Sequence, residues 1–166
     1  MRLLKPMSEA NMVTMRTETY SISSYPWRTN HDVRFSDVDV NGHVNNGAFN
    51  ALMESSRGIL FCSEEIATAA PYKFVLARFE IDFLASLSFP GNVEAGIGVL
   101  RMGNSSLLLK QALFNGAVCA AEAYATIVAV DPDTLRACDM GEGLRREFKH
   151  WLMGADRAES KVSETL

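Results

Sequence analysis

Residues 37–46 read Asp37-Val38-Asp39-Val40-Asn41-Gly42-His43-Val44-Asn45-Asn46, and polar groups are nowhere else in the chain so concentrated between ordered-looking segments. An apolar segment with helical periodicity begins directly afterwards, at Ala48. Polar side chains gathered where a helix begins form a turn, a metal-binding loop or an active site. The rest of the sequence helps to decide which of these three structures residues 37–46 form.

The segments on either side of this stretch predict a strand followed by a helix. Over residues 31–36, Val33 and Phe35 alternate with polar residues, which predicts a short strand. Over about residues 47–63, apolar residues recur at helical spacing, namely Phe49, Leu52, Met53, Ile59 and Leu60. The polar stretch therefore connects a strand to the long helix.

Strand-like segments without a helical pattern between them follow, at about residues 75–85, 93–99, 107–114 and 117–130. Asn115-Gly116 is the strongest hairpin signal, because both positions tolerate positive φ. The last segment has a face of alanines, which predicts the close approach of a helix or a second sheet. A short amphipathic helix is expected around residues 144–152.

Short turns between strands force antiparallel neighbours, and no crossover helices are present for a parallel sheet. The predicted fold is therefore α+β, with one long helix packed on a five-stranded antiparallel sheet. One helix cannot cover such a sheet, so an obligate dimer or a larger assembly is expected. We expect a flexible arm over residues 1–25, one domain over residues 26–153 and a polar tail over residues 154–166.

The composition excludes several classes of function. The 166 residues are 48% hydrophobic and 22% charged, as in ordinary globular domains. The net charge of −4, with no basic block, argues against nucleic acid as a partner, and no apolar run reaches membrane-spanning length. Three widely spaced cysteines, at positions 62, 119 and 138, suit a reducing and therefore cytoplasmic compartment.

Calcium binding is the first interpretation of the polar stretch. Asp37, Asp39, Asn41 and Gly42 match the first positions of an EF-hand loop. The position of the bidentate glutamate, however, is occupied by Ala48, and a strand rather than a helix precedes the loop. No metal site is therefore expected.

A structural turn and an acyl-transfer site are the other two interpretations. Asn, Asp and Gly are common in turns and helix caps. A helix N-terminus also presents unpaired N–H groups that suit an oxyanion, and a neighbouring carboxylate can attack a carbonyl or activate water. A thioester is a suitable substrate for such a site, because its thiolate leaving group needs no strong general acid.

The sequence RFSDVDVNGHVNN of residues 34–46, with the following helix, resembles hotdog-fold acyl-CoA thioesterases of the 4-hydroxybenzoyl-CoA thioesterase type. The likeness continues through residues 79–84 and 103–106 and covers about residues 30–135. It implies the hotdog fold and hydrolysis of an acyl-CoA thioester to free acid and CoA. It also implies no cofactor apart from the CoA of the substrate, and an active site at the interface of a homodimer or homotetramer.

The resemblance assigns roles to particular residues. Asp39 corresponds to the catalytic carboxylate, acting as nucleophile or general base. The oxyanion donors correspond to the backbone amides of Asn45, Asn46 and Gly47. The turn that often contacts CoA corresponds to Arg101, Asn104, Ser105 and Ser106. Arg57 and Lys110 are further basic candidates, unless they are ordinary surface cations.

The stretch also resembles plant acyl-carrier-protein thioesterases, whose catalytic Asn and His match Asn41 and His43. The acidic residue expected on the next strand falls near Ser86, so we interpret Asn41 and His43 as orienting or water-holding groups. An acyl-carrier-protein thioester therefore stays open as the substrate. The alternatives are a hotdog enoyl-CoA hydratase, whose motif has one more residue before the histidine, and a hotdog protein that binds acyl-CoA without turnover.

Overall fold

The computed structural model describes residues 21–69 and 72–154 and contains a five-stranded antiparallel sheet in the order β1-β3-β4-β5-β2. The predicted α+β class and antiparallel sheet are confirmed. The strands are β1 (Trp27–Val33), β2 (Lys73–Phe83), β3 (Gly91–Met102), β4 (Ser106–Asn115) and β5 (Val118–Val130). The helices are η1 (Ile22–Ser24), η2 (Phe35–Asp37), α2 (Asn46–Phe61), α3 (Glu64–Ala69) and α4 (Gly141–Lys149).

Long-range pairing places β1 and β2 at the two edges of the sheet. β3, β4 and β5 form consecutive hairpins, and Gly116 adopts a φ of 59° in the tight turn between β4 and β5. β2 pairs only with β5, and β1 pairs with the first half of β3. The main-chain groups of Val99, beyond the end of β1, bond to residues 151 and 153 instead. The outer side of β2 has no neighbouring strand within the described chain.

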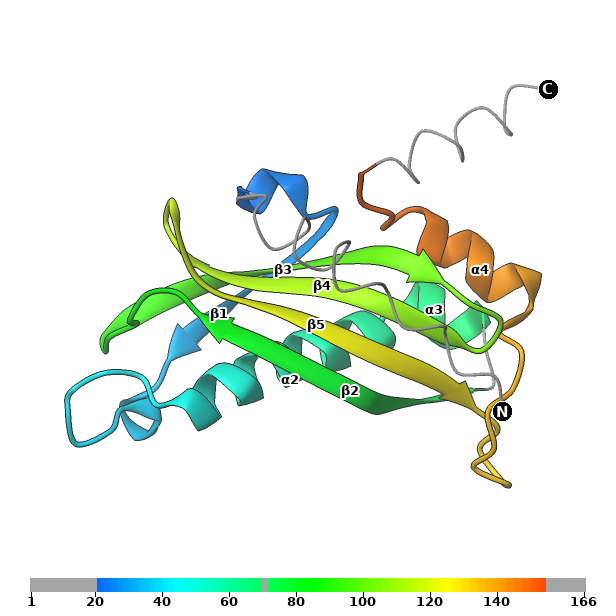
Figure 1. Cartoon of the computed structure of the whole chain (residues 1–166), viewed down its shortest axis with the longest axis horizontal. Coiled ribbons are helices and arrows are strands. Elements are labelled where there is room, and N and C mark those ends of the chain that lie inside the picture. The colour runs from blue at the N-terminus through cyan, green and yellow to red at the C-terminus, as the bar shows by residue number, and fades with distance from the viewer. Residues whose placement is uncertain (1–20, 70–71, 155–166) are drawn as a thin grey trace.

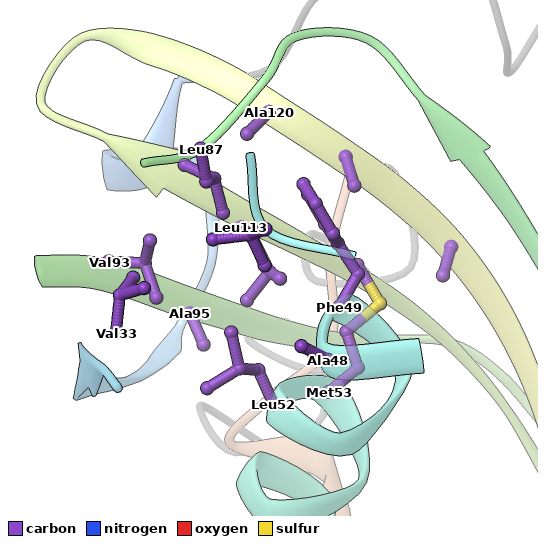
Figure 2. Close-up of a cluster of buried hydrophobic side chains, with 13 residues drawn as sticks. Val33, Ala48, Phe49, Leu52, Met53, Leu87, Val93, Ala95, Leu113 and Ala120 are labelled. Atoms are coloured by element: carbon purple, nitrogen blue, oxygen red, sulfur yellow. The ribbon is translucent and has the colours of Figure 1, made fainter. Parts of the chain in front are cut away.

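Helix α2 lies along one side of the sheet (Figure 1) and buries one face against it. Figure 2 shows Phe49, Leu52 and Met53 of this helix meeting Val93 and Leu113 of the sheet. Ala121 and Ala123 of the alanine face of β5 lie in this same core, whereas the buried Ala125 and Ala129 belong to a neighbouring cluster with Leu60 and Phe148. The small side chains of Ala121 and Ala123 lie in one cluster with the large side chains of Phe49 and Met53.

Two local predictions were wrong. The first strand begins at Trp27 and ends at Val33, and Phe35 is 79% exposed at the start of η2 instead of lying on a strand face. The strand ends there because Asp37 accepts hydrogen bonds from the backbone and guanidinium of Arg34, which closes a turn. Beyond α2, the chain forms the short helix α3, where only a turn was expected.

The sheet face opposite α2 is covered partly by residues 22–25, drawn in blue in Figure 1. Tyr25, which fell within the expected arm, is fully buried and lies where a Cβ on Gly96 would be. Lys110 and Glu122 form a buried ion pair beneath it, with Lys110 Nζ 3.3 Å from Glu122 Oε1. Residues 1–20 and 155–166, most of the expected arm and tail, lie outside the described residues.

Within the described ranges, no helix is long and apolar enough to cross a membrane. The thiols of Cys62, Cys119 and Cys138 are free.

Candidate active site

The polar stretch forms a closed loop between η2 and α2. Val38 and Val44 pair across it, and Asn45 N–H donates to the carbonyl of Asp37 at 2.9 Å. The N–H of Val44, which is buried, donates to the carbonyl of Leu87 and so ties the loop to the segment before β3. Gly42 supplies the positive φ of 80° that the tip of the loop requires.

Asp37 stabilises this loop through hydrogen bonds with Arg34. Its carboxylate is buried and accepts from Arg34 N–H at 2.8 Å and from Arg34 Nη2 at 2.8 Å. These bonds, the guanidinium bond foremost, hold the pKa of the Asp37 carboxyl below its usual range. Asp37 therefore faces away from solvent and is occupied by the turn.

Asp39, in contrast to the buried Asp37, is an exposed and ionised carboxylate. Its Oδ1 accepts from Asn41 N–H at 2.8 Å and from His43 N–H at 3.4 Å, and its Oδ2 accepts from Asn41 Nδ2 at 3.3 Å. The backbone bond from Asn41 is the main reason why the pKa of Asp39 lies below its usual range. The loop thus brings Asp39, Asn41 and His43 together around one carboxylate that faces solvent.

The start of α2 lies immediately after this carboxylate loop. Asn45 caps the helix, because its Oδ1 accepts from Ala48 N–H at 2.8 Å. Its own N–H is already used by the Asp37 carbonyl. In the described structure, the N–H groups of Asn46 and Gly47, two exposed residues, form no hydrogen bond. Two backbone donors therefore remain at the positive end of the helix dipole.

The residues expected to contact CoA lie at the other end of the sheet. Phe83, which touches Phe49 near the start of α2, pairs with Ala121, whereas Ser106 pairs with Val128. These two positions are seven residue steps apart on β5, which corresponds to roughly 23 Å. One copy of the chain therefore does not bring Asp39 together with Arg101, Asn104, Ser105 and Ser106.

The turn that carries these residues is held by α4. Arg145 donates from Nη1 to the Gly103 carbonyl at 2.9 Å and from Nη2 to the Asn104 carbonyl at 2.7 Å. Asn104 is exposed, whereas Ser106 is buried. The role of Arg145 was not predicted, because its only local signal is its position on the polar side of an amphipathic helix.

Two basic residues that could have been surface cations are buried instead. Arg57 is 5% exposed, beneath α2, and Lys110 is 1% exposed, on the opposite face of the sheet. Arg57 follows Phe49 and Met53 at intervals of four residues, which places it on the same helix face and is the signal that could have revealed its burial. Gln111, the hydrogen-bond partner of Arg57, was also missed.

No group of three or more His, Cys, Asp or Glu side chains that could hold a metal ion is found among residues 21–69 and 72–154. The first two EF-hand positions illustrate why, since the Asp37 carboxylate is bonded to Arg34 and the Asp39 carboxylate to Asn41.

An antiparallel sheet packed on a helix, with a polar loop at the N-terminus of that helix, defines the hotdog class of folds. The chain belongs to the Thioesterase-like superfamily, whose family model matches residues 33–151. None of the curated proteins matches the chain.

Solved structures support the same assignment. A thioesterase from Thermus thermophilus, complexed with coenzyme A and zinc, is 29% identical with a TM-score of 0.67, over 76% of this chain and 94% of that one. A protein from Pseudomonas aeruginosa strain PAO1 is 24% identical with a TM-score of 0.73, over 81% and 97%. YbaW, a probable thioesterase from Escherichia coli, is 23% identical with a TM-score of 0.65, over 75% and 98%. The last two likenesses show the fold alone.

Proposed function

We propose that the protein hydrolyses acyl-CoA thioesters, with Asp39 as the catalytic carboxylate. The observation that carries this proposal is the pairing of an exposed, ionised carboxylate with two unused backbone donors at the start of α2. An ionised carboxylate is the form that can attack a carbonyl or accept a proton from water. The assignment of Asp39 follows the 4-hydroxybenzoyl-CoA thioesterase type, in which one carboxylate performs this step.

The general-base and nucleophilic mechanisms that Asp39 could follow stabilise the oxyanion in the same way. As a general base, Asp39 takes a proton from a water molecule whose oxygen bonds to the thioester carbon. As a nucleophile, Asp39 bonds to that carbon itself, and water later cleaves the resulting anhydride. In both, the oxyanion accepts from the N–H groups of Asn46 and Gly47, the C–S bond breaks, and CoA leaves as a thiolate.

Asn41 and His43 act as positioning groups in this proposal. Asn41 holds the carboxylate from its backbone and its side chain, and His43 holds it from its backbone. These bonds limit the rotation of the Asp39 side chain, so that one oxygen is kept aimed at the substrate. The imidazole of His43 is exposed, next to the place where water would be held.

A second copy of the chain completes the site in this proposal. β2 is an edge strand whose outer side is open in the described structure, and it exposes Val75, Leu76 and Phe83, as does Leu84 just after it. Antiparallel pairing of two β2 strands would cover these side chains and place the 103–106 turn of one copy near the Asp39 loop of the other. Arg101, Asn104, Ser105 and Ser106 would then reach CoA bound by the partner's loop. The relative from Thermus thermophilus, crystallised with coenzyme A, supports CoA as the carrier.

An acyl-CoA panel tests this function directly. Release of free CoA is measured by reaction of its thiol with DTNB, over acyl chains of increasing length and over aromatic acyl groups. Acyl-carrier-protein thioesters and enoyl-CoA esters are assayed in parallel. Turnover of CoA esters is the expected result, whereas tight binding without thiol release, or hydration of enoyl-CoA alone, would contradict the proposal.

A further inference from the structure

Helix α2 and strand β2 form a continuous seam that begins at the proposed oxyanion donors. Three side-chain contacts define this α2–β2 seam, and they occur in reverse order along β2 as the helix proceeds. They are Phe49 with Phe83, Arg57 with Phe79, and Phe61 with Phe74. Because β2 is an edge strand, the seam lies beside the open edge of the sheet.

Arg57 is the charged residue of this seam. It is 5% exposed, and its guanidinium carbon lies 5.0 Å from the centre of the Phe79 ring. Its Nη1 donates to Gln111 Oε1 at 2.6 Å. Gln111 is itself fixed, because its Nε2 donates to the Met53 carbonyl at 3.1 Å. The neutral amide of Gln111 is therefore held in the orientation in which it accepts from the guanidinium, but it does not compensate the positive charge of Arg57.

Arg57 forms no ion pair in the described part of the protein. Its bond to Gln111 uses one of five N–H donors. A buried charge without a partner is costly, and burial accordingly lowers the pKa of Arg57. The neighbouring Glu54 carboxylate offsets only part of this effect. The seam thus holds an anchored cation with unused donors.

We propose that Arg57 binds a carboxylate at the far end of the acyl group, so that the enzyme prefers ω-carboxyacyl thioesters. This inference rests on the proposed thioesterase function. A carboxylate pairs with a guanidinium through two parallel hydrogen bonds, which would use the donors that Gln111 leaves open. An apolar acyl chain would instead leave the cation buried and unpaired.

The position of Arg57 sets the length of the acyl group. Arg57 follows Asn46 by eleven residues along α2, which corresponds to roughly 16 Å of helix axis. Long side chains on a helix point back toward its N-terminus, so the span from Asn46 to the guanidinium is shorter than this. An acyl group of about six to eight carbons bridges this distance, with its thioester carbonyl at Asn46 and Gly47.

The wild-type protein provides the first test. Suberoyl-CoA and octanoyl-CoA have the same chain length and differ in the terminal carboxylate. We expect kcat/KM for suberoyl-CoA to exceed that for octanoyl-CoA by about 10- to 100-fold, the range of one charged hydrogen-bonded pair. Equal values, or a preference for octanoyl-CoA, would overturn the inference while leaving the thioesterase function intact. Failure to hydrolyse either ester, or any other member of the panel, would overturn both.

Substitutions on the seam provide the second test. Arg57→Gln should bring the ratio of the two kcat/KM values close to one, and Arg57→Lys should keep part of the preference. Gln111→Glu preserves shape and gives Arg57 an internal carboxylate, so it should also abolish the preference. Arg28→Gln, an exposed change on the opposite edge strand β1, is the matched control and should leave the ratio unchanged. If Arg57→Gln lowered both rates equally, Arg57 would be a structural residue or a contact to the second copy.

Discussion

The imidazole Nε2 of His31 on β1 lies 2.8 Å from Ser56 Oγ on α2. The hydroxyl of Ser56 donates its one proton to the Leu52 carbonyl at 2.8 Å, so it accepts from Nε2–H of His31. Ser56 is fully buried and His31 is half-buried. This bond joins the edge strand that leads into the Asp39 loop to the helix that leaves it, and so helps to fix the geometry of the site.

The burial of His31 makes stability depend on pH in a specific way. Burial lowers the pKa of His31, so between its folded and unfolded values, the latter about 6.5, the unfolded chain binds more protons. Stability should therefore fall as the pH drops below about 6.5. Urea unfolding of the wild type and His31→Asn should show a cost of substitution that is largest above pH 7 and smaller at pH 5.

Ser56→Ala is the matched control for this prediction. It removes the same hydrogen bond without removing the titrating group, at a cost of about 1 kcal/mol. Because both forms of the imidazole can donate from Nε2, this cost should not change with pH. A cost of His31→Asn that is constant from pH 5 to pH 8 would contradict the account.

The buried pair of Lys110 and Glu122 should be far more sensitive to losing one partner than to losing both. Lys110→Met leaves the Glu122 carboxylate buried without its cation and should cost about 3–5 kcal/mol of unfolding free energy. The double change Lys110→Met with Glu122→Leu should recover most of this loss. Tyr25 OH, which lies 3.4 Å from Glu122 Oε1, would then lack that acceptor, so recovery should be incomplete by about 1 kcal/mol.

Chemical denaturation of the three proteins measures this difference. Equal destabilisation by the single and the double change would mean that shape, and not charge, determines the role of Lys110.

Activity should persist to acidic pH. The pKa of Asp39 lies below its usual range, chiefly because Asn41 N–H donates to it. In the proposed mechanism, the ionised form is the active one. The acid limb of kcat/KM should therefore lie below the ordinary aspartate value of about 3.9. Asn41→Ala removes the side-chain bond only and should move this limb to higher pH. The pH–rate profiles of the wild type and of Asn41→Ala show which protein has its acid limb at the higher pH. An acid limb near neutral pH in the wild type would mean that a group other than Asp39 titrates.

The exposed edge of β2 offers a test of the proposed second copy. Leu76→Lys places a charge on a side chain that is 44% exposed and that the proposed pairing of two β2 strands would cover. Sedimentation should then show a monomer, and thioester hydrolysis should fall, because the proposed site takes its CoA-binding turn from the partner. Val118→Lys, at a position that is 56% exposed at the start of β5, is the control. Full activity of a Leu76→Lys monomer would contradict the two-copy site.

Local signals in the sequence were sufficient for much of the fold. Asn115-Gly116 predicted the β4–β5 turn because its backbone demands are local, and the spacing of Phe49, Leu52 and Met53 predicted the buried face of α2. The end of β1 was predicted incorrectly, since Phe35 continues the alternation of Val33 although the Arg34–Asp37 bonds turn the chain. The alternation of apolar and polar residues carries no information about a turn that side-chain hydrogen bonds close.

The burial of charged residues was beyond the sequence for a different reason. Arg57 is buried by Gln111 and Phe79, and Lys110 by Glu122 and Tyr124, none of them a neighbour in the sequence. Such contacts depend on strand order, which alternation does not reveal. The stretch of residues 37–46 could be located as a candidate site, but the distinction between a buried Asp37 and an exposed Asp39 required the structure.

The most direct measurement is the rate of thiol release from an acyl-CoA ester by Asp39→Asn, compared with the wild type and with Asp32→Asn as an exposed control on β1. The substitution keeps the size of the side chain but removes its charge, so it cannot attack or accept a proton. We predict that kcat/KM falls by about a hundredfold or more while the urea midpoint changes little. Hydrolysis by Asp39→Asn at the wild-type rate would contradict the central claim.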